Sequence, residues 1–224
     1  MRCDCMKRCF LALLLLMVTM LPEGIVSVPS LLPTEGAGGS GLVRVEAIDP
    51  HIVLDLRYAS ADNFSGKPVY PVNVALLQRE TARKLAAANA ELMERGYRLK
   101  LWDAYRPFHL HQLLWELAGD KRYFFADPRY GSAHNRGAAV DVTLVDARGR
   151  EVEMPTDFDD FSGGAHRHAP MSPAVRANLD LLTEVMSRNG FQYIDFEWWH
   201  FEDISWWQYP LLDLPLELFL RDEQ

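Results

Sequence analysis

The chain has 224 residues, of which 49% are hydrophobic and 24% charged, and its formal net charge at pH 7 is −8. This composition excludes a disordered protein, because disordered chains have too few hydrophobic residues to form a core. The acidic excess argues against a surface for nucleic acid or anionic lipid, whose phosphates attract basic side chains. The length predicts a single domain, since one core generally serves ~100–200 residues. These exclusions favour a site for a small molecule.

The first residues have the pattern of a targeting segment. Arg2, Lys7 and Arg8 precede an almost entirely apolar run over residues 10–21, which is the order found in secretory signal peptides. The run is shorter than the ~20 residues that span a bilayer. We therefore expect residues 1–27 to be a signal peptide with an undefined cleavage site. The mature protein is expected to be periplasmic or extracellular, without stable insertion in a membrane.

The cysteines and the segment that follows limit the chemistry of the mature protein. Cys3, Cys5 and Cys9 all lie in the expected signal peptide, so the exported chain would have no disulfide and no thiolate ligand. Any metal ion must then be bound by histidine or carboxylate side chains. Residues 28–41 are rich in glycine and have no hydrophobic period, which predicts a flexible lead-in. The folded domain is expected over residues 42–224.

The first half of this domain predicts an alternation of strands and helices. Residues 54–58 alternate apolar and polar side chains, as a strand with one buried face does. Apolar residues at helical spacing predict a helix over residues 76–95, with Gly96 at its C-terminal cap. A second strand is expected over residues 97–102, followed by a helix over residues 107–118 that opens at a proline.

The second half continues with a strand rich in Val and Ala over residues 138–145. Ser172 and the proline after it provide an N-cap and first turn for a helix that ends before Gly190. A final strand is expected over residues 191–201. Because regular βαβ alternation is missing, the sequence predicts an α+β fold. We expect a single domain in which helices flank a central, mainly antiparallel sheet.

Two short segments carry residue types suited to a metal ion, and the first contains His134 and Asp141. His134 lies in a predicted turn and Asp141 in an apolar strand, with glycine and small residues between them. A carboxylate between Val140 and Val142 is costly to bury unless it is paired or bound to a cation. The small residues would allow backbone and ligand to approach closely.

The second segment is the sequence EWWH, which contains Glu197 and His200. On a regular strand, residues of opposite parity face opposite sides of the sheet. Glu197 and His200 could therefore not serve one metal ion from an undistorted strand. We predict a bulge, a strand end or a turn between them.

Together these residues fit a catalytic zinc site. His134, Asp141 and His200 provide three ligands and leave a fourth position for water, whose pKa zinc lowers to ~7. Glu197 is then the general base that takes a proton as water attacks a carbonyl. Arg106, at the predicted strand-to-helix junction, is the candidate that stabilises the resulting oxyanion. One Zn²⁺ per chain is expected, at one end of the sheet.

Each ligand candidate also has an explanation that involves no metal. His134 could belong to a capped turn, and His200 could be a hydrogen-bonded core residue beside two tryptophans. Asp141 could form a buried ion pair with Arg136 or Arg106. The spacings His-x6-Asp and Glu-x-x-His do not by themselves decide between these readings and a metal site.

Four motifs carry a resemblance to a known family: DLRYASADNFSGKP at 55–68, WDAYRP at 102–107, SAHNRGAAVD at 132–141 and EWWH at 197–200. Their order and separations resemble those of the D-alanyl-D-alanine dipeptidase family, the VanX-like zinc peptidases, over roughly residues 45–215. The resemblance implies the roles already assigned from the residues. His134, Asp141 and His200 would bind zinc, Glu197 would be the base, and Arg106 would stabilise the tetrahedral intermediate.

The same resemblance implies three substrate contacts that the residues alone do not indicate. Tyr58, Ser132 and Asp159 match positions that contact the small substrate in the family. Asp159 would face the ammonium end, where a carboxylate provides the opposite charge. Ala133 stands where some relatives have a second serine, so one hydrogen bond to the dipeptide would be absent.

The expected activity is hydrolysis of the dipeptide D-Ala-D-Ala to two D-Ala in cell-wall peptide turnover. One alternative is a D,D-carboxypeptidase or endopeptidase that acts on longer peptidoglycan peptides, which an open groove would favour over a small cavity. A second alternative is a zinc-binding module without turnover. That reading requires a fourth protein ligand, such as His166, His168 or Asp159. No nucleic-acid partner is expected, and the sequence does not indicate the oligomeric state.

Overall fold

The computed structural model describes residues 39–220. The expected signal peptide at 1–27 and most of the lead-in at 28–41 lie outside these residues. None of the helices in the described part of the chain has the length and apolar character needed to span a bilayer.

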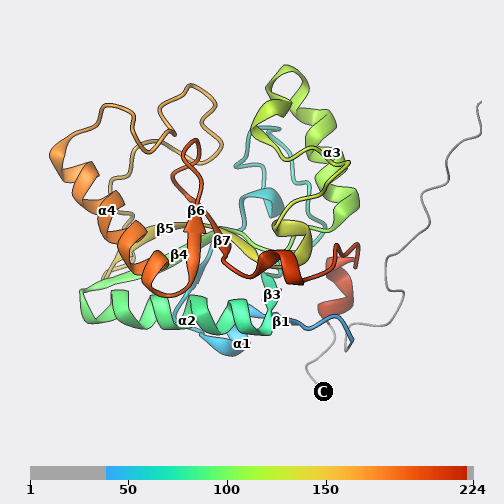
Figure 1. Cartoon of the computed structure of the whole chain (residues 1–224), viewed down its shortest axis with the longest axis horizontal. Helices are drawn as coiled ribbons and strands as arrows, with labels where there is room; N and C mark the ends of the chain where they lie inside the picture. Colours follow the sequence, from blue (N-terminus) through green and yellow to red (C-terminus); the bar gives the residue numbers. More distant parts are fainter. Residues whose placement is uncertain (1–38, 221–224) are drawn as a thin grey trace, which may run out of the picture. The chain divides into compact units, whose positions relative to one another are not determined.

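A mixed five-stranded sheet lies at the centre of the fold, with strand order β2–β4–β5–β7–β6 (Figure 1). Strand β2 runs parallel to β4, and the other neighbouring strands pair antiparallel. A separate antiparallel pair is formed by β1 and β3. The strands are β1 Leu42–Arg44, β2 Val53–Leu54, β3 Leu76–Gln78, β4 Tyr97–Asp103, β5 Ala139–Asp146, β6 Phe191–Tyr193 and β7 His200–Asp203.

Helices flank this sheet, and the predicted α+β class is confirmed. Helices α2 and α4 pack against each other, α2 also against β4 and α4 against β6, whereas α3 packs against the turn that follows it (Figure 1). The α-helices are α1 Val45–Ile48, α2 Arg79–Glu94, α3 Phe108–Ala118 and α4 Pro173–Arg188. Short 3-10 turns cover η2 Arg57–Ala59, η3 Gly119–Phe124, η4 His134–Arg136, η5 Trp206–Gln208 and η6 Leu216–Phe219.

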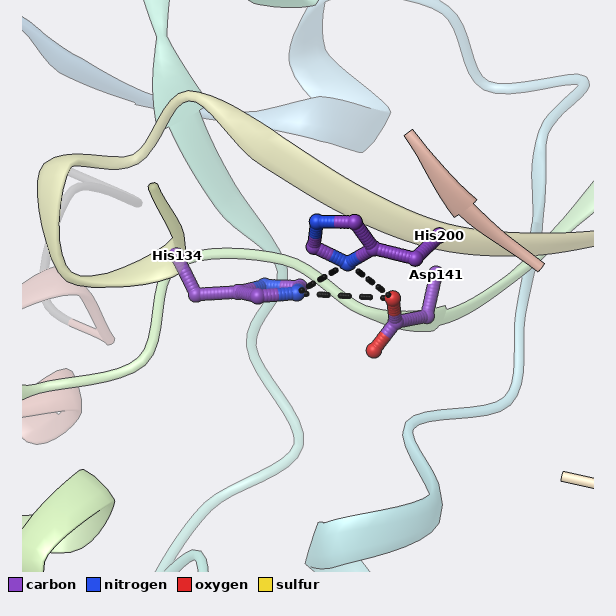
Figure 2. A group of neighbouring side chains, drawn as sticks. All are labelled: His134, Asp141 and His200. Atoms are coloured by element: carbon purple, nitrogen blue, oxygen red, sulfur yellow. Dashed lines mark hydrogen bonds and ion pairs between the residues drawn. The ribbon is translucent and has the colours of Figure 1, made fainter. Parts of the chain in front are cut away.

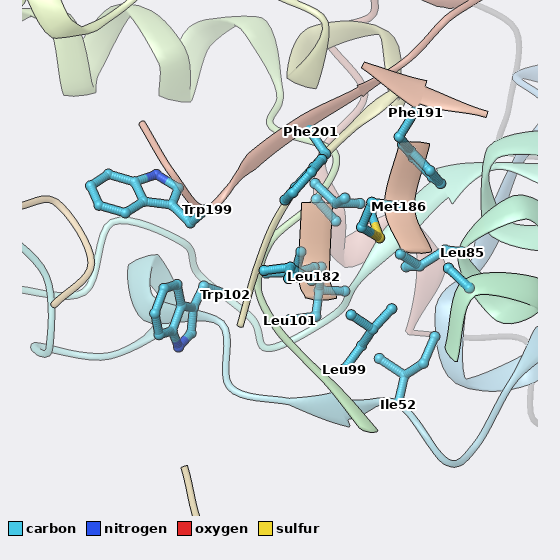
Figure 3. Packing of buried hydrophobic residues seen from close by; sticks show 14 of the residues in the cluster. Ile52, Leu85, Leu99, Leu101, Trp102, Leu182, Met186, Phe191, Trp199 and Phe201 are labelled. Carbon is cyan, nitrogen blue, oxygen red and sulfur yellow. The ribbon is translucent and has the colours of Figure 1, made fainter. Parts of the chain in front are cut away.

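The main hydrophobic core joins α2 and α4 to the sheet (Figure 3). Leu85 of α2, Leu99 and Leu101 of β4, and Leu182 and Met186 of α4 are all fully buried. Burial of each such side chain contributes ~1.5–3 kcal/mol relative to exposure. This core holds the central strands in a fixed register, and that register determines which polar side chains meet at the site.

The expected strand over 54–58 is much shorter in the structure. Strand β2 covers only Val53–Leu54, and the backbone of Asp55 makes one more bond, from its N–H to the carbonyl of Leu101 at 3.0 Å. The chain then turns, because the N–H of Ala59 bonds to the carbonyl of Leu56. This turn buries Tyr58, whose spacing in the sequence also suits a strand.

The expected final strand over 191–201 is two strands, β6 and β7. A loop separates them, and the N–H of His200 bonds back to the carbonyl of Glu197 at 3.3 Å. The predicted break between these two residues is therefore confirmed as a turn. The helix expected over 76–95 begins only at Arg79, because the three residues before it pair with β1 as β3.

Gly137 makes the turn from η4 into β5 and permits a close approach of the backbone. Its φ is +66°, a left-handed conformation, and an added Cβ would lie 2.5 Å from Cδ2 of Leu42 and 3.2 Å from the backbone nitrogen of Gln78. The left-handed conformation alone costs a non-glycine residue ~1–2 kcal/mol. We expect Gly137→Ala to lower the free energy of unfolding by more than about 2 kcal/mol in denaturant titrations.

A matched control isolates the steric part of this effect. Gly66 has the same φ of +66°, but nothing lies within 4 Å of a Cβ added there. Gly66→Ala should therefore show only the conformational cost of ~1–2 kcal/mol. Equal losses in the two variants would contradict the close packing around Gly137.

Candidate functional site

Strand register brings the first polar side chains of the site together. Asp141 of β5 lies directly opposite His200 of β7, so their side chains project from the same face of the sheet. On the other side of β5, an irregularity after Leu101 aligns Asp103 of β4 with Asp141. Three adjacent strands thus place Asp103, Asp141 and His200 in one row.

His134 reaches this row from the 3-10 turn η4. Its carbonyl accepts a hydrogen bond from the backbone of Arg106 at 3.1 Å, which ties the turn to the end of β4. Its Nδ1 lies 2.7 Å from the carbonyl oxygen of Ala104, so this nitrogen carries the proton and donates. Nε2 is consequently left as a lone-pair donor that faces Asp141 and His200.

The three side chains form a compact donor set (Figure 2). Nε2 of His134 lies 3.2 Å from Nδ1 of His200 and 3.4 Å from Oδ1 of Asp141, and these last two atoms are 3.0 Å apart. A tetrahedral ion with bonds of about 2.1 Å has ligand atoms roughly 3.4 Å from one another. The donor atoms are therefore already spaced to hold such an ion.

A second carboxylate, that of Glu202, contacts the ring of His200. Nε2 of His200 lies 3.4 Å from Oε1 of Glu202, which fixes the ring with Nδ1 toward Asp141. Burial would lower the pKa of His200, but hydrogen bonds to Asp141 and Glu202 raise it to about 10. The site thus favours a positive charge at this position, which a proton or a metal ion can supply.

Arg106 is held rigidly beside the donor set. Its Nε and Nη2 donate to Oδ2 of Asp103 at 3.0 and 2.6 Å, and its Nη1 donates to Nδ1 of His111 at 3.2 Å. These contacts use three of its five N–H groups. The guanidinium also lies over the ring of Tyr58, with 5.2 Å between its carbon and the ring centre.

His111 can accept this bond because its ring is neutral. Its Nε2 donates to the carbonyl of Ala126 at 2.8 Å, which leaves a lone pair on Nδ1 for Arg106. Burial and the charge of Arg106 lower the pKa of His111 to about 3. The imidazole therefore orients the guanidinium without competing with its charge.

Asp159 and Tyr58 are hydrogen-bonded to each other, with the ring of Tyr58 against Arg106. The hydroxyl of Tyr58 donates to the carboxylate of Asp159, at 3.2 and 3.1 Å from its two oxygens. Asp159 has a φ of +58°, and strained backbone of this kind is common where a side chain is aimed at a ligand. Burial, together with the charges of Asp141 and Glu197, raises the pKa of Asp159 well above its usual range. A cationic group in the cavity would reverse that effect.

Glu197 lies at the start of the turn that precedes β7. Burial is the main reason that its pKa is raised to about 7, with a contribution from the charge of Asp141 against the opposing effects of His200 and Arg106. A carboxyl group with a pKa near neutrality is well matched to proton transfer at physiological pH.

All the site residues predicted from the sequence line one cavity of about 260 Å³. This volume is small compared with the ~300–1,000 Å³ of sites for drug-sized ligands. The walls also include aromatic side chains, among them Phe125 and Trp199. The predicted residues in the lining are Tyr58, Arg106, Ser132, His134, Asp141, Asp159, Glu197 and His200.

Other acidic and histidine residues near the site lie outside the donor set or line another cavity. Asp157 and Asp160, the neighbours of Asp159, line a different cavity. Within residues 39–220, the metal-binding group consists of the three donors in Figure 2 and does not include His166, His168 or Asp159. The donor set therefore has no fourth protein ligand in the described part of the chain.

Sequence reasoning missed three supporting residues: Asp103, His111 and Glu202. Glu202 lies two residues after His200, so strand parity placed both side chains on one face and could have revealed it. Asp103 and His111 depend on a strand irregularity and on a long-range contact of α3, for which the sequence gives no signal. Ser132, in contrast, was expected, and its hydroxyl accepts a bond from the backbone of Asn135 at 3.3 Å.

Comparison with known proteins identifies the family of the chain. A family model described as D-ala-D-ala dipeptidase, Peptidase_M15, matches residues 39–213. A D-alanyl-D-alanine dipeptidase of Escherichia coli (strain K12) is 37% identical over 172 residues, which cover 76% of this chain and 89% of that protein. One from Enterococcus faecalis (strain ATCC 700802 / V583) is 31% identical, over 67% of this chain and 85% of that protein.

A solved structure, VanYB in complex with D-Alanine-D-Alanine, aligns with 69% of this chain and 88% of its own. Its TM-score is 0.38 and its sequence identity to this chain is 16%. The family model and the two dipeptidases match most of the chain. The chain belongs to the Peptidase_M15 family of D-alanyl-D-alanine dipeptidases, which are metallopeptidases.

Proposed function

We propose that this protein hydrolyses D-Ala-D-Ala to two molecules of D-Ala with one bound Zn²⁺. The observation that carries the proposal is the small cavity in which a His–Asp–His donor set lies together with a glutamate, an arginine and an aspartate. The names of the related dipeptidases support the same substrate.

The donor set fits the proposed ion in both chemistry and spacing. His134, Asp141 and His200 would hold it through two nitrogens and one oxygen, the ligand types of catalytic zinc sites. Once bound there, zinc would supply a water molecule of lowered pKa and a charge that polarises the peptide carbonyl. The open fourth position favours catalysis over the alternative of a closed zinc-binding module.

Asp159 and Tyr58 suit the ammonium end of a free dipeptide. Asp159 presents a half-buried carboxylate, held by Tyr58, to the proposed position of the substrate ammonium group. Charge pairing of this kind is strong in a buried site. The cavity volume of about 260 Å³ favours a dipeptide over the longer peptidoglycan peptides of the alternative reading.

The proposed reaction assigns the proton to Glu197 and the developing charge to Arg106. As the water oxygen bonds to the carbonyl carbon, its proton passes to the carboxylate of Glu197. The carbonyl oxygen becomes an oxyanion, which the remaining N–H groups of Arg106 stabilise. Glu197 then returns the proton to the amide nitrogen as the carbon–nitrogen bond breaks, and two D-Ala leave.

Export is part of the proposal and rests on the basic and apolar pattern of residues 1–27. An exported dipeptidase would meet D-Ala-D-Ala released from the cell wall rather than newly made dipeptide. The corresponding role is turnover of cell-wall peptides or recovery of D-Ala. The domain would then comprise residues 42–224.

The first prediction from the proposed function concerns the base. Glu197→Gln removes the proton acceptor and keeps the shape of the side chain, so kcat should fall about 10²–10⁴-fold while one zinc ion per chain remains bound. Release of D-Ala and metal analysis measure the two quantities. Glu217→Gln, at an exposed residue of the 3-10 turn η6, is the control and should keep wild-type kcat. Unchanged turnover in Glu197→Gln would reject the assignment.

The second prediction concerns the metal and the substrate length. A chelator should abolish D-Ala release, and added Zn²⁺ should restore it. His134→Ala should bind less than one ion per chain, because one of the three proposed ligands is lost. The control is His109→Ala. His109 lies on α3 beside Asp213, and this variant should bind one ion.

A pentapeptide ending in D-Ala-D-Ala should be a poor substrate. Faster release of D-Ala from the pentapeptide than from D-Ala-D-Ala would favour the carboxypeptidase reading.

The third prediction tests the charge of Asp159. Asp159→Asn should raise the KM for D-Ala-D-Ala about 10- to 100-fold, the range expected when a charge-assisted hydrogen bond is lost. The KM for the N-acetylated dipeptide, which has no ammonium group, should change little. Asp157→Asn is the matched control in the same segment and should leave both KM values unchanged. A similar increase for both substrates would place the ammonium group elsewhere.

A further inference from the structure

Arg167 is a buried cation outside the cavity, in the segment between β5 and α4. Only 4% of the residue is exposed. Among the described residues, no carboxylate oxygen lies within the 4.0 Å of an ion pair with its guanidinium. A buried charge without a partner is costly, so the contacts that replace an ion pair indicate what the residue does.

The guanidinium donates to acceptors on both sides of the loop that carries Glu197. Its Nε donates to the carbonyl of Ile194 at 2.9 Å, and its Nη2 donates to the carbonyl of Trp198 at 2.7 Å. Its Nη1 donates to the hydroxyl of Thr183 on α4 at 2.7 Å. The side chain therefore joins the two ends of the loop to a rigid helix.

Two aromatic rings fix the guanidinium from the strands that border this loop. Its carbon lies 4.4 Å from the ring centre of Tyr193, the last residue of β6, and 4.8 Å from that of Phe201 in β7. Stacking of this kind favours a charged, planar group. The guanidinium is thus held between the end of one strand and the start of the next.

Backbone hydrogen bonds add two further connections between the same segments. The N–H of Arg167 donates to the carbonyl of Asp195 at 2.8 Å, and the N–H of Trp198 donates to the carbonyl of Ala165 at 3.0 Å. The residues bonded in the loop stand on both sides of Glu197 in the sequence. The carboxylate of Glu197 takes no part in these hydrogen bonds, and Glu197 lines the cavity.

We propose that Arg167 is a positioning residue for Glu197. Its guanidinium holds the carbonyls on either side of Glu197 and so fixes the carboxylate relative to His134, Asp141 and His200. This inference rests on the proposed role of Glu197 as the general base. Proton transfer requires hydrogen-bond reach, and an error of about 1 Å in such a group can cost ~10²-fold in rate.

The chemistry of arginine suits this task better than that of lysine. A guanidinium presents its N–H groups in a rigid plane, so one side chain can bind two separate carbonyls and stack on two rings. Burial lowers the pKa of Arg167 to about 10, so the group stays charged at neutral pH. A lysine ammonium could reach one carbonyl but would lose the planar stacking.

The test compares Arg167→Met and Arg167→Lys with the wild type, each as the full zinc-loaded chain with D-Ala-D-Ala as substrate. Arg167→Met should lower kcat at least about 10-fold, while KM changes less than about 3-fold and one zinc ion per chain stays bound. Arg167→Lys should recover part of kcat. If Arg167→Met does not fold, Thr183→Val, which removes one acceptor, should still lower kcat about 2- to 5-fold.

Val185→Ala is the control for a general loss of stability, because it removes core volume on α4 but none of the hydrogen-bond partners of the Arg167 side chain. It should lower the melting temperature but keep wild-type kcat. A folded, zinc-loaded Arg167→Met with wild-type kcat would overturn the inference, as would an equal loss of kcat in Val185→Ala. Wild-type turnover in Glu197→Gln would instead reject the proposed base, whatever the Arg167 variants show.

Discussion

The pairing of β5 with β7 is the constraint on which the site depends. It sets Asp141 directly opposite His200, and this register brings both side chains side by side on one face. A shift by one residue would send one of them into the core on the other face. The buried leucines and Met186 beneath the sheet resist such a shift, because it would expose apolar side chains. Hydrophobic packing thus fixes the geometry of the polar site.

A second constraint is the buried carboxylate of Asp103. It accepts hydrogen bonds from Arg106 and from the hydroxyl of Tyr70, the latter at 2.7 Å. The desolvation cost of burying an aspartate and an arginine together is offset only when most of their polar atoms have partners. The pair gives Arg106 a fixed direction, so no reorganisation is required when negative charge develops in the cavity.

The sequence predicted the α+β class, most of the long elements and eight of the residues that line the cavity. It predicted the turn after Glu197 because strand parity forbids a regular strand there. It placed Tyr58 on a strand, since alternation of apolar residues does not distinguish a strand from a buried turn. It gave no role to Arg167, because two of its three side-chain acceptors are backbone carbonyls about 30 residues away, and backbone carbonyls are the same in every sequence.

The parts of the site are held by different elements, and this separation has a mechanistic consequence. Sheet register and η4 position the metal donors, whereas the loop before β7 positions Glu197 and is held from α4 through Arg167. Loosening the loop would displace Glu197 more than His200, because His200 is also paired with Asp141 across the sheet. Metal affinity and catalytic rate can then vary independently, because a side chain that positions the base contacts none of the atoms that bind the ion.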